Sequence, residues 1–203
     1  MVVNYIYRPF RCVDGCSDCC IYRQYFPSVE YGKTGVLLLP HEKLRIENCA
    51  RRDGTEIKIL PRIGISEEIQ NGGPDKIIMY QIMGRETNGN TCPFLDIDSD
   101  KRAPNGGYPC KIYEERPLAC HAYPVIHCTE NQNPVLDTKC MFCKANTEIP
   151  EKNSLIKELS SLKKIKRYSR ISGTATVWRY ATHIGEKKDR MKFLPQGWVL
   201  QDV

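Results

Sequence analysis

The most informative stretch of the chain reads Cys12-Val13-Asp14-Gly15-Cys16-Ser17-Asp18-Cys19-Cys20. Six more cysteines follow in two later groups, which are Cys92, Cys110 and Cys120, and then Cys128, Cys140 and Cys143. Thiolates favour soft partners such as zinc, iron–sulfur clusters and Cu(I). The sequence therefore predicts a fold that is organised around metal.

The spacing of the cysteines indicates how a metal site is assembled. One short loop presents two or three thiolates to an ion, and the remaining ligands of a tetrahedral site usually come from a second loop. We therefore expect residues 12–20 to share metal with Cys92, Cys110 and Cys120. The side chains of the adjacent Cys19 and Cys20 tend to point apart, so either they serve two centres or only one of them is a ligand.

The third group of cysteines is a candidate for a second metal site, or it completes the first. Cys140 and Cys143 are separated by two residues, which is the knuckle spacing of many zinc sites. Cys128 joins them in this prediction, and His121 and His127 are reserve ligands. Cys49 stands outside all three groups and is expected to be a small buried apolar residue.

A disulfide framework is the main alternative to metal. The chain has 11 cysteines, and an odd count leaves one thiol over. Its first residues lack the basic and then apolar pattern of a secretory signal. We expect a reduced, metal-binding, cytoplasmic protein. No apolar run approaches the roughly 20 residues of a membrane helix, so no membrane association is expected.

Charge divides the chain into two parts. Among its 203 residues, the first 150 have a net charge of −1, whereas residues 151–203 hold twelve Lys and Arg against five Asp and Glu. We predict a cysteine-cluster metal-binding domain over 1–150 and a basic helical extension over 151–203. The 151–192 segment is a possible contact for nucleic acid. A solvated helix face is favoured, because Tyr168 and Trp178 are the few aromatic residues there that could stack on bases.

Local patterns predict a small, irregular α+β fold. Apolar runs and alternation indicate strands at 35–39, 56–60, 77–83 and 93–96, with a loop over 64–75. Pro40 and Glu42 open a helix that Arg51 and Arg52 close, and residues 114–122 suit one or two helical turns. Apolar residues at three- to four-residue spacing predict helices over 151–168 and 174–184.

Two further motifs carry a family resemblance. They are Cys92-Pro93-Phe94-Leu95 and Cys110-Lys111-Ile112-Tyr113-Glu114-Glu115-Arg116-Pro117-Leu118-Ala119-Cys120-His121-Ala122-Tyr123-Pro124. Together with residues 10–20, they resemble the YkgJ-type CxxCxxCC cysteine-cluster family, which is described as a zinc- or iron-chelating domain. The resemblance covers roughly residues 10–125.

The resemblance implies a set of metal ligands, namely Cys12, Cys16, Cys19, Cys20, Cys92, Cys110 and Cys120. The chain departs from the family pattern in two places. Three residues separate Cys12 from Cys16 where the pattern has two, and His121 stands where the family usually has arginine. The resemblance therefore gives ligands but no reaction and no catalytic residue.

The expected function is the binding of a zinc ion or a [4Fe–4S] cluster by cysteine thiolates, for a structural or electron-transfer role. A cluster-dependent protein-modifying system is one alternative, because the related flagellin lysine methylase family carries a similar cysteine domain. In that case the partner would be a protein. A zinc-stapled nucleic-acid-binding module is the other alternative. Whether the chain catalyses a reaction is left open, since no glycine-rich nucleotide turn follows a strand.

Overall fold

A computed structural model describes residues 10–21, 25–28, 32–68, 73–85, 91–131, 133–145, 152–171, 175–182 and 197–200. The predicted α+β class is confirmed, since short helices accompany antiparallel sheets. The largest sheet has the strand order β3-β5-β4-β8-β9. Its strands are β3 (Val36–Leu38), β4 (Ile59–Ser66), β5 (Lys76–Ile82), β8 (Thr176–Tyr180) and β9 (Trp198–Leu200).

The helix α2 (Pro40–Arg52) forms where the sequence predicts it. Its buried face, which includes Ile46 and Cys49, packs with Val36 and Leu38 of β3 and with Ile82 of β5. Phe94 and Ile112 come from the cysteine-bearing loops and join the same core. This first core therefore connects the sheet to the segments that carry Cys92 and Cys110.

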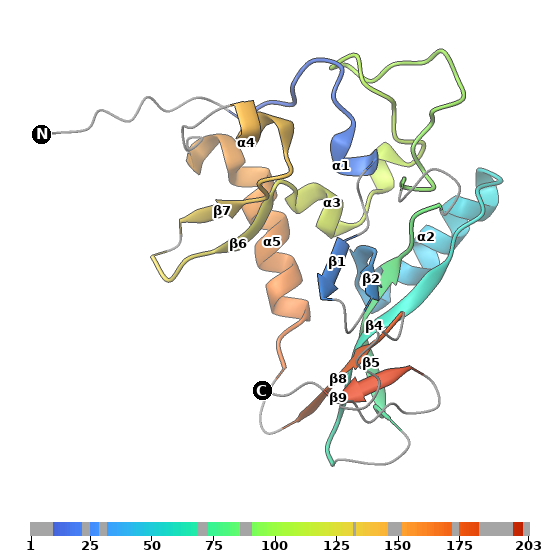
Figure 1. Ribbon diagram of the computed structural model, residues 1–203, viewed down its shortest axis with the longest axis vertical. Coiled ribbons are helices and arrows are strands. Elements are labelled where there is room, and N and C mark those ends of the chain that lie inside the picture. Colours follow the sequence, from blue (N-terminus) through green and yellow to red (C-terminus); the bar gives the residue numbers. More distant parts are fainter. Residues whose placement is uncertain are drawn as a thin grey trace, which may run out of the picture.

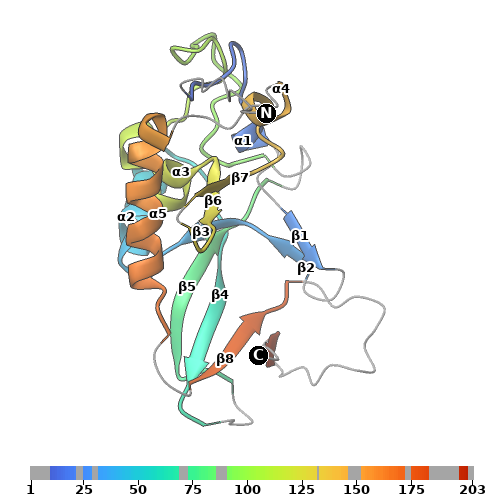
Figure 2. The same cartoon turned by 90° about the vertical axis from the view of Figure 1, so that its left-hand side faces the viewer.

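A second core lies between the helices α3 (Leu118–Ala122) and α5 (Ile156–Tyr168). The 3-10 turn η2 (Lys152–Leu155) leads into α5, whose burial of Leu162 and Ile165 agrees with the helix predicted over 151–168. Its residues Lys163, Lys164, Lys166 and Arg167 are exposed. Figure 2 shows α5 running along the same side of the sheet as α2.

The remaining elements are short. They are α1 (Asp18–Ile21), the pair β1 (Tyr25–Ser28) and β2 (Gly32–Thr34), η1 (Tyr113–Glu115), the pair β6 (Val125–Cys128) and β7 (Pro134–Leu136), and α4 (Met141–Ala145). In Figure 1, α1, α4 and the green loop of residues 95–110 gather at one end of the molecule, and β8 and β9 lie at the other. Within the part of the chain that the structure describes, no helix is long and apolar enough to cross a membrane.

The helix predicted over 174–184 is wrong, because residues 176–180 form β8. Trp178 pairs with Gly64 of β4 and with Leu200 of β9, is only 3 % exposed, and donates its indole N–H to Ser66 Oγ at 2.8 Å. In the part of residues 151–203 that the structure describes, η2 and α5 are followed by the strands β8 and β9, and Trp178 is not exposed for base stacking. Ile184, the last residue of the predicted helix, lies outside the described residues.

Two smaller predictions also need correction. The strand expected at 56–60 begins at Ile59 and continues to Ser66, into the region predicted as loop. Residues 93–96 form a turn, and Leu95 makes only an isolated bridge to Cys110. Strands β8 and β9 follow residue 150 yet pair into the same sheet as β4, while the domain division at 150 stays a prediction.

A buried carboxylate connects α2 to α3. Glu42 is 3 % exposed, and its two oxygens accept the backbone N–H of Leu39 at 3.0 Å and that of Leu118 at 2.8 Å. Arg45 supplies a partial counter-charge at 3.4 Å. Glu42 thereby satisfies donors at the beginning of both helices, and α3 is the helix that carries Cys120.

We expect Glu42→Gln to lower the free energy of unfolding by about 1–3 kcal/mol, because the amide retains only one acceptor oxygen for two buried N–H groups. Denaturant titration under reducing conditions measures the change. Glu47→Gln is the matched control, since Glu47 forms an exposed i,i+4 pair with Lys43, and such pairs contribute at most about 0.5 kcal/mol. Equal effects of the two substitutions would contradict the proposed role of Glu42.

Candidate metal centre

One cavity collects every cysteine of the first two groups. Its volume is about 260 Å³, and the cysteines that line it are Cys12, Cys16, Cys19, Cys20, Cys92, Cys110 and Cys120. They come from the loop before α1, from α1 itself, from two turns and from α3. Segments that lie far apart in the sequence thus present their thiols to one space.

The first cysteine loop is held in place by the loop of residues 103–108. Gly15 adopts a left-handed conformation with φ of 73°, which glycine permits without strain. The Asn105 amide donates to the carbonyls of Val13 and Cys16 at 3.2 and 3.0 Å, and the Tyr108 N–H donates to Ser17 Oγ at 2.7 Å.

Glycine at position 107 permits this close approach. A Cβ atom there would lie 2.5 Å from the Cys16 carbonyl oxygen and 2.6 Å from Ser17 Oγ. A larger residue would therefore push the first loop away from the second. The role of Gly107 depends on a contact that only the fold creates.

Backbone hydrogen bonds bring Cys92 and Cys110 to the same cavity. The Cys92 N–H donates to the Cys20 carbonyl at 2.7 Å, which fixes one turn directly to α1. The Lys111 N–H donates to the Phe94 carbonyl at 2.9 Å, beside the Leu95–Cys110 bridge. The Phe94 side chain is 1 % exposed and anchors this turn in the first core.

Arg116 places a positive charge at the wall of the cavity. Its Nε donates to the Tyr113 carbonyl at 2.8 Å, and its guanidinium lies 3.8 Å from the centroid of the Tyr113 ring. This charge lowers the pKa values of the Cys12 and Cys110 thiols and opposes the effect of their burial. Arg116 is therefore suited to offset the negative charge of nearby thiolates.

Burial is the largest influence on the thiols. It raises the pKa of Cys110 to about 11, and the neighbouring Cys120 adds to the rise. Cys12 is the exposed member of the set, yet its partial desolvation still raises its pKa, with further contributions from Cys19, Cys140 and Cys16. Without metal these thiols hold their protons at neutral pH, because a raised pKa disfavours the thiolate.

The three cysteines of the third group do not lie together in the structure. Cys140 lies close enough to Cys12 and Cys16 to raise the pKa of each thiol. Cys143 follows on α4, and burial, with the charge and a hydrogen bond of Cys140, raises its pKa to about 12. Cys128, at the end of β6, packs instead against the second core.

The two reserve histidines and Cys49 do not line the cavity. His121 lies on α3, where burial and then the charge of Arg116 lower its pKa, and His127 is exposed on β6. Cys49 is buried, as expected, and burial and then a hydrogen bond with Glu115 raise its pKa. Cys49 thus lies apart from the thiols that line the cavity.

The donors around the cavity match a soft metal. Its lining includes seven thiols but no Asp, Glu or His, and the rest is mainly apolar or aromatic. Hard cations such as Mg²⁺ and Ca²⁺ need oxygen ligands, whereas zinc, iron–sulfur clusters and Cu(I) accept thiolates. In the described part of the chain, no three Cys, His, Asp or Glu side chains form a closed ligand set, so side chains must rotate to enclose an ion. Cys19 Sγ and Cys20 Sγ lie 4.0 Å apart, so these adjacent side chains approach each other and do not point apart as the sequence predicts.

Comparison with known families agrees with this chemistry. The CxxCxxCC family model, which is described as a zinc- or iron-chelating domain, matches residues 11–148. The chain therefore belongs to the CxxCxxCC family, as its motifs predict. The match extends past residue 125, so it includes Cys128, Cys140 and Cys143. No curated protein and no solved structure matches the chain significantly.

The raised thiol pKa values predict that metal affinity increases with pH. Each protonated thiol must lose a proton to become a ligand, so the apparent affinity falls by up to about tenfold per thiol for each pH unit below the thiol pKa. Chelator competition between pH 6.5 and 8.5, together with measured proton release, tests this dependence. An affinity independent of pH would show that the metal-free thiols are already ionised.

We expect Cys140→Ser combined with Cys143→Ser to lower the metal content or metal affinity, because Cys140 approaches the thiols of Cys12 and Cys16. Elemental analysis of protein purified without oxygen measures the metal per chain. Cys128→Ser is the matched comparison and tests whether all three cysteines act together. Unchanged metal content and stability in the double variant would leave Cys140 and Cys143 as ordinary half-buried thiols.

Proposed function

We propose that this chain binds a zinc ion or an iron–sulfur cluster through cysteine thiolates, for a structural or electron-transfer role. The observation that carries the proposal is the gathering of seven thiols from separate segments on one cavity whose lining has no carboxylate or imidazole group. The proposed ligands are drawn from Cys12, Cys16, Cys19, Cys20, Cys92, Cys110 and Cys120, and Cys140 and Cys143 are candidates to extend the set. A cytoplasmic location is part of the proposal, because reduced thiols persist there.

The structural role follows from how little else holds the cysteine-bearing segments. Residues 91–112 consist of turns, bends and isolated bridges, and Phe94, Leu95 and Ile112 are their main buried apolar residues. Ordering such a segment costs about 1–2 kcal/mol per residue in backbone entropy. Thiolate–metal bonds would offset that cost, since a structural zinc contributes on the order of 10 kcal/mol.

Of the two metal groups proposed, the size of the cavity favours the iron–sulfur cluster over a single zinc ion. A mononuclear zinc site is compact, with Zn–S bonds of about 2.3 Å and four ligands. A cavity of about 260 Å³ lined by seven thiols exceeds that need. The remaining volume suits a larger iron–sulfur group. Such a group is also what a cluster-dependent protein-modifying system would need. An iron–sulfur group would supply one-electron chemistry, while Arg116 would balance charge at its edge.

The test removes one thiol from inside the cavity and one from outside it. We expect Cys110→Ala to lower the metal per folded chain and Cys49→Ala to leave it unchanged, because Cys110 lines the cavity and Cys49 does not. Elemental analysis and a visible spectrum of protein purified without oxygen identify the metal, since zinc is colourless and iron–sulfur clusters absorb. Equal metal content in the two variants would refute the proposed site.

Metal removal tests the structural role separately. Chelation under reducing conditions should expose protease sites within residues 91–112 before those in α5, because α5 belongs to the second core and residues 91–112 do not. Limited proteolysis with mass spectrometry locates the first cuts. A chelated, fully reduced protein with the same thermal midpoint and the same cuts would show that the metal has no structural role.

A further inference from the structure

A second cavity of about 460 Å³ lies away from the thiols, among β3, α3, β6 and α5. Apolar side chains dominate its walls, among them Leu37, Ala122, Val125, Ile126, Leu162 and Ile165. Arg62, Lys139 and Asp137 also line it. Cavities that combine an apolar interior with a few placed polar groups are typical of small-molecule sites.

Arg62 reaches this cavity because of an irregularity in β4. The register between β4 and β5 shifts from Pro61–Tyr80 to Ile63–Met79, so Arg62 has no partner of its own across the pair. Such a β-bulge redirects a side chain, and bulges recur beside functional sites. The redirected Arg62 reaches the residue that precedes β3, where its Nη1 donates to the Gly35 carbonyl at 3.3 Å.

The Arg62 guanidinium has more donors than the described residues use. It carries five N–H groups, and the bond to Gly35 is a long one. Within the described residues no Asp or Glu forms a salt bridge with it, although Asp137 lines the same cavity. Asp137 Oδ1 accepts the backbone N–H of Lys139 at 2.9 Å.

The surroundings of Arg62 make its positive charge unfavourable. Burial, followed by repulsion from Arg179, lowers the pKa of Arg62 to about 10, although the side chain keeps partial contact with solvent. Arg179 belongs to β8 and pairs with Ile63, next to Arg62. Holding a cation in such a place is unfavourable unless an anion joins it.

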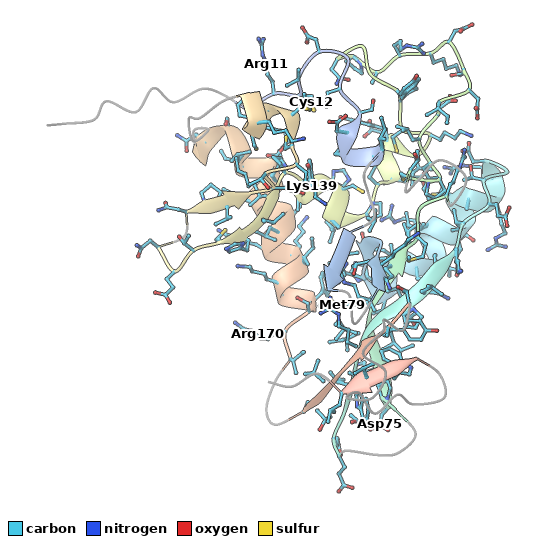
Figure 3. The ribbon with its side chains drawn as sticks, in the orientation of Figure 1. Arg11, Cys12, Asp75, Met79, Lys139 and Arg170 are labelled. Atoms are coloured by element: carbon cyan, nitrogen blue, oxygen red, sulfur yellow. The ribbon has the colours of Figure 1, made fainter. Side chains whose placement is uncertain are left out.

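We propose that this cavity binds a small organic carboxylate, whose carboxyl group is held by Arg62 and whose apolar body lies against Leu37, Val125 and Leu162. Arginine suits this task because its planar group matches a carboxylate with two parallel hydrogen bonds. Lys139 adds positive charge to the lining. Figure 3 labels Lys139 between α3 and the β6–β7 pair, above Met79 of β5.

The proposed carboxylate cavity is adjacent to the cysteine cavity. Val36 and Tyr123 line both cavities, so a bound carboxylate would lie behind a wall of the cysteine cavity. Carboxylate binding does not require the metal, because neither Arg62 nor the apolar wall belongs to the thiol set. Carboxylate binding and metal binding can therefore succeed or fail separately.

Calorimetric titration of the metal-loaded protein tests the proposal with octanoate and 4-phenylbutyrate as probes. We expect saturable binding of at least one probe and binding at least about tenfold weaker for its neutral amide, octanamide or 4-phenylbutyramide. Arg62→Gln should weaken binding of the carboxylate by a similar factor. Arg170→Gln, which removes an exposed charge at the end of α5, should leave it unchanged.

Two further measurements keep the test independent of folding. Arg62→Gln without ligand should have an unchanged or higher thermal midpoint, because it removes a poorly compensated cation. Arg62→Lys keeps the charge but not the planar group and should bind with intermediate affinity. The proposal is overturned if neither carboxylate saturates the wild-type protein, if the matching amide binds equally well, or if both Arg62 variants bind like wild type.

Discussion

A carboxylate with almost no contact with solvent joins α2 to α3, the helix that carries Cys120. Glu42 lies in the first turn of α2, yet it also accepts the N–H of Leu118 at the beginning of α3. Leu39, whose N–H it accepts as well, belongs to the second core, while Ile46 of the same helix belongs to the first. One side chain thus connects the helix that carries Cys120 to the helix that packs on the sheet. A neutral side chain could not satisfy both buried donors as well.

The two ends of the molecule are stabilised by different means. At one end, β4 pairs with β5 and β8, and Trp178 is buried between sheet partners, so apolar burial and ladder hydrogen bonds suffice. At the other end, the cysteine loops are joined by a few hydrogen bonds, such as that between Cys92 and Cys20, and by the close approach of Gly107. Residues 91–112, which carry Cys92 and Cys110, form only turns, bends and isolated bridges. A metal at that end would therefore stabilise the fold most.

Local signals predicted some elements well and failed where distant partners decide. Pro40 and Glu42 marked the start of α2 correctly, because helix termini are specified by nearby residues. Residues 174–184 suggested a helix, since Val177, Tyr180 and Ala181 recur at helical spacing. Pairing with β4 and β9 makes residues 176–180 a strand instead. Gly64 looked like part of a loop, but it lies inside β4, where a Cβ would come within 2.5 Å of Pro74.

The sequence by itself determined the donor chemistry and the family, because a thiol keeps its preference for soft metals wherever it lies, and the cysteine motifs are contiguous strings. Only the tertiary structure decided that all seven thiols of the first two groups line one cavity, that Cys140 approaches Cys12, and that Cys49 lies apart. It also decided that a bulge turns Arg62 toward an apolar cavity. Proximity between distant residues depends on packing and hydrogen bonds formed by the whole chain, and no local pattern encodes it.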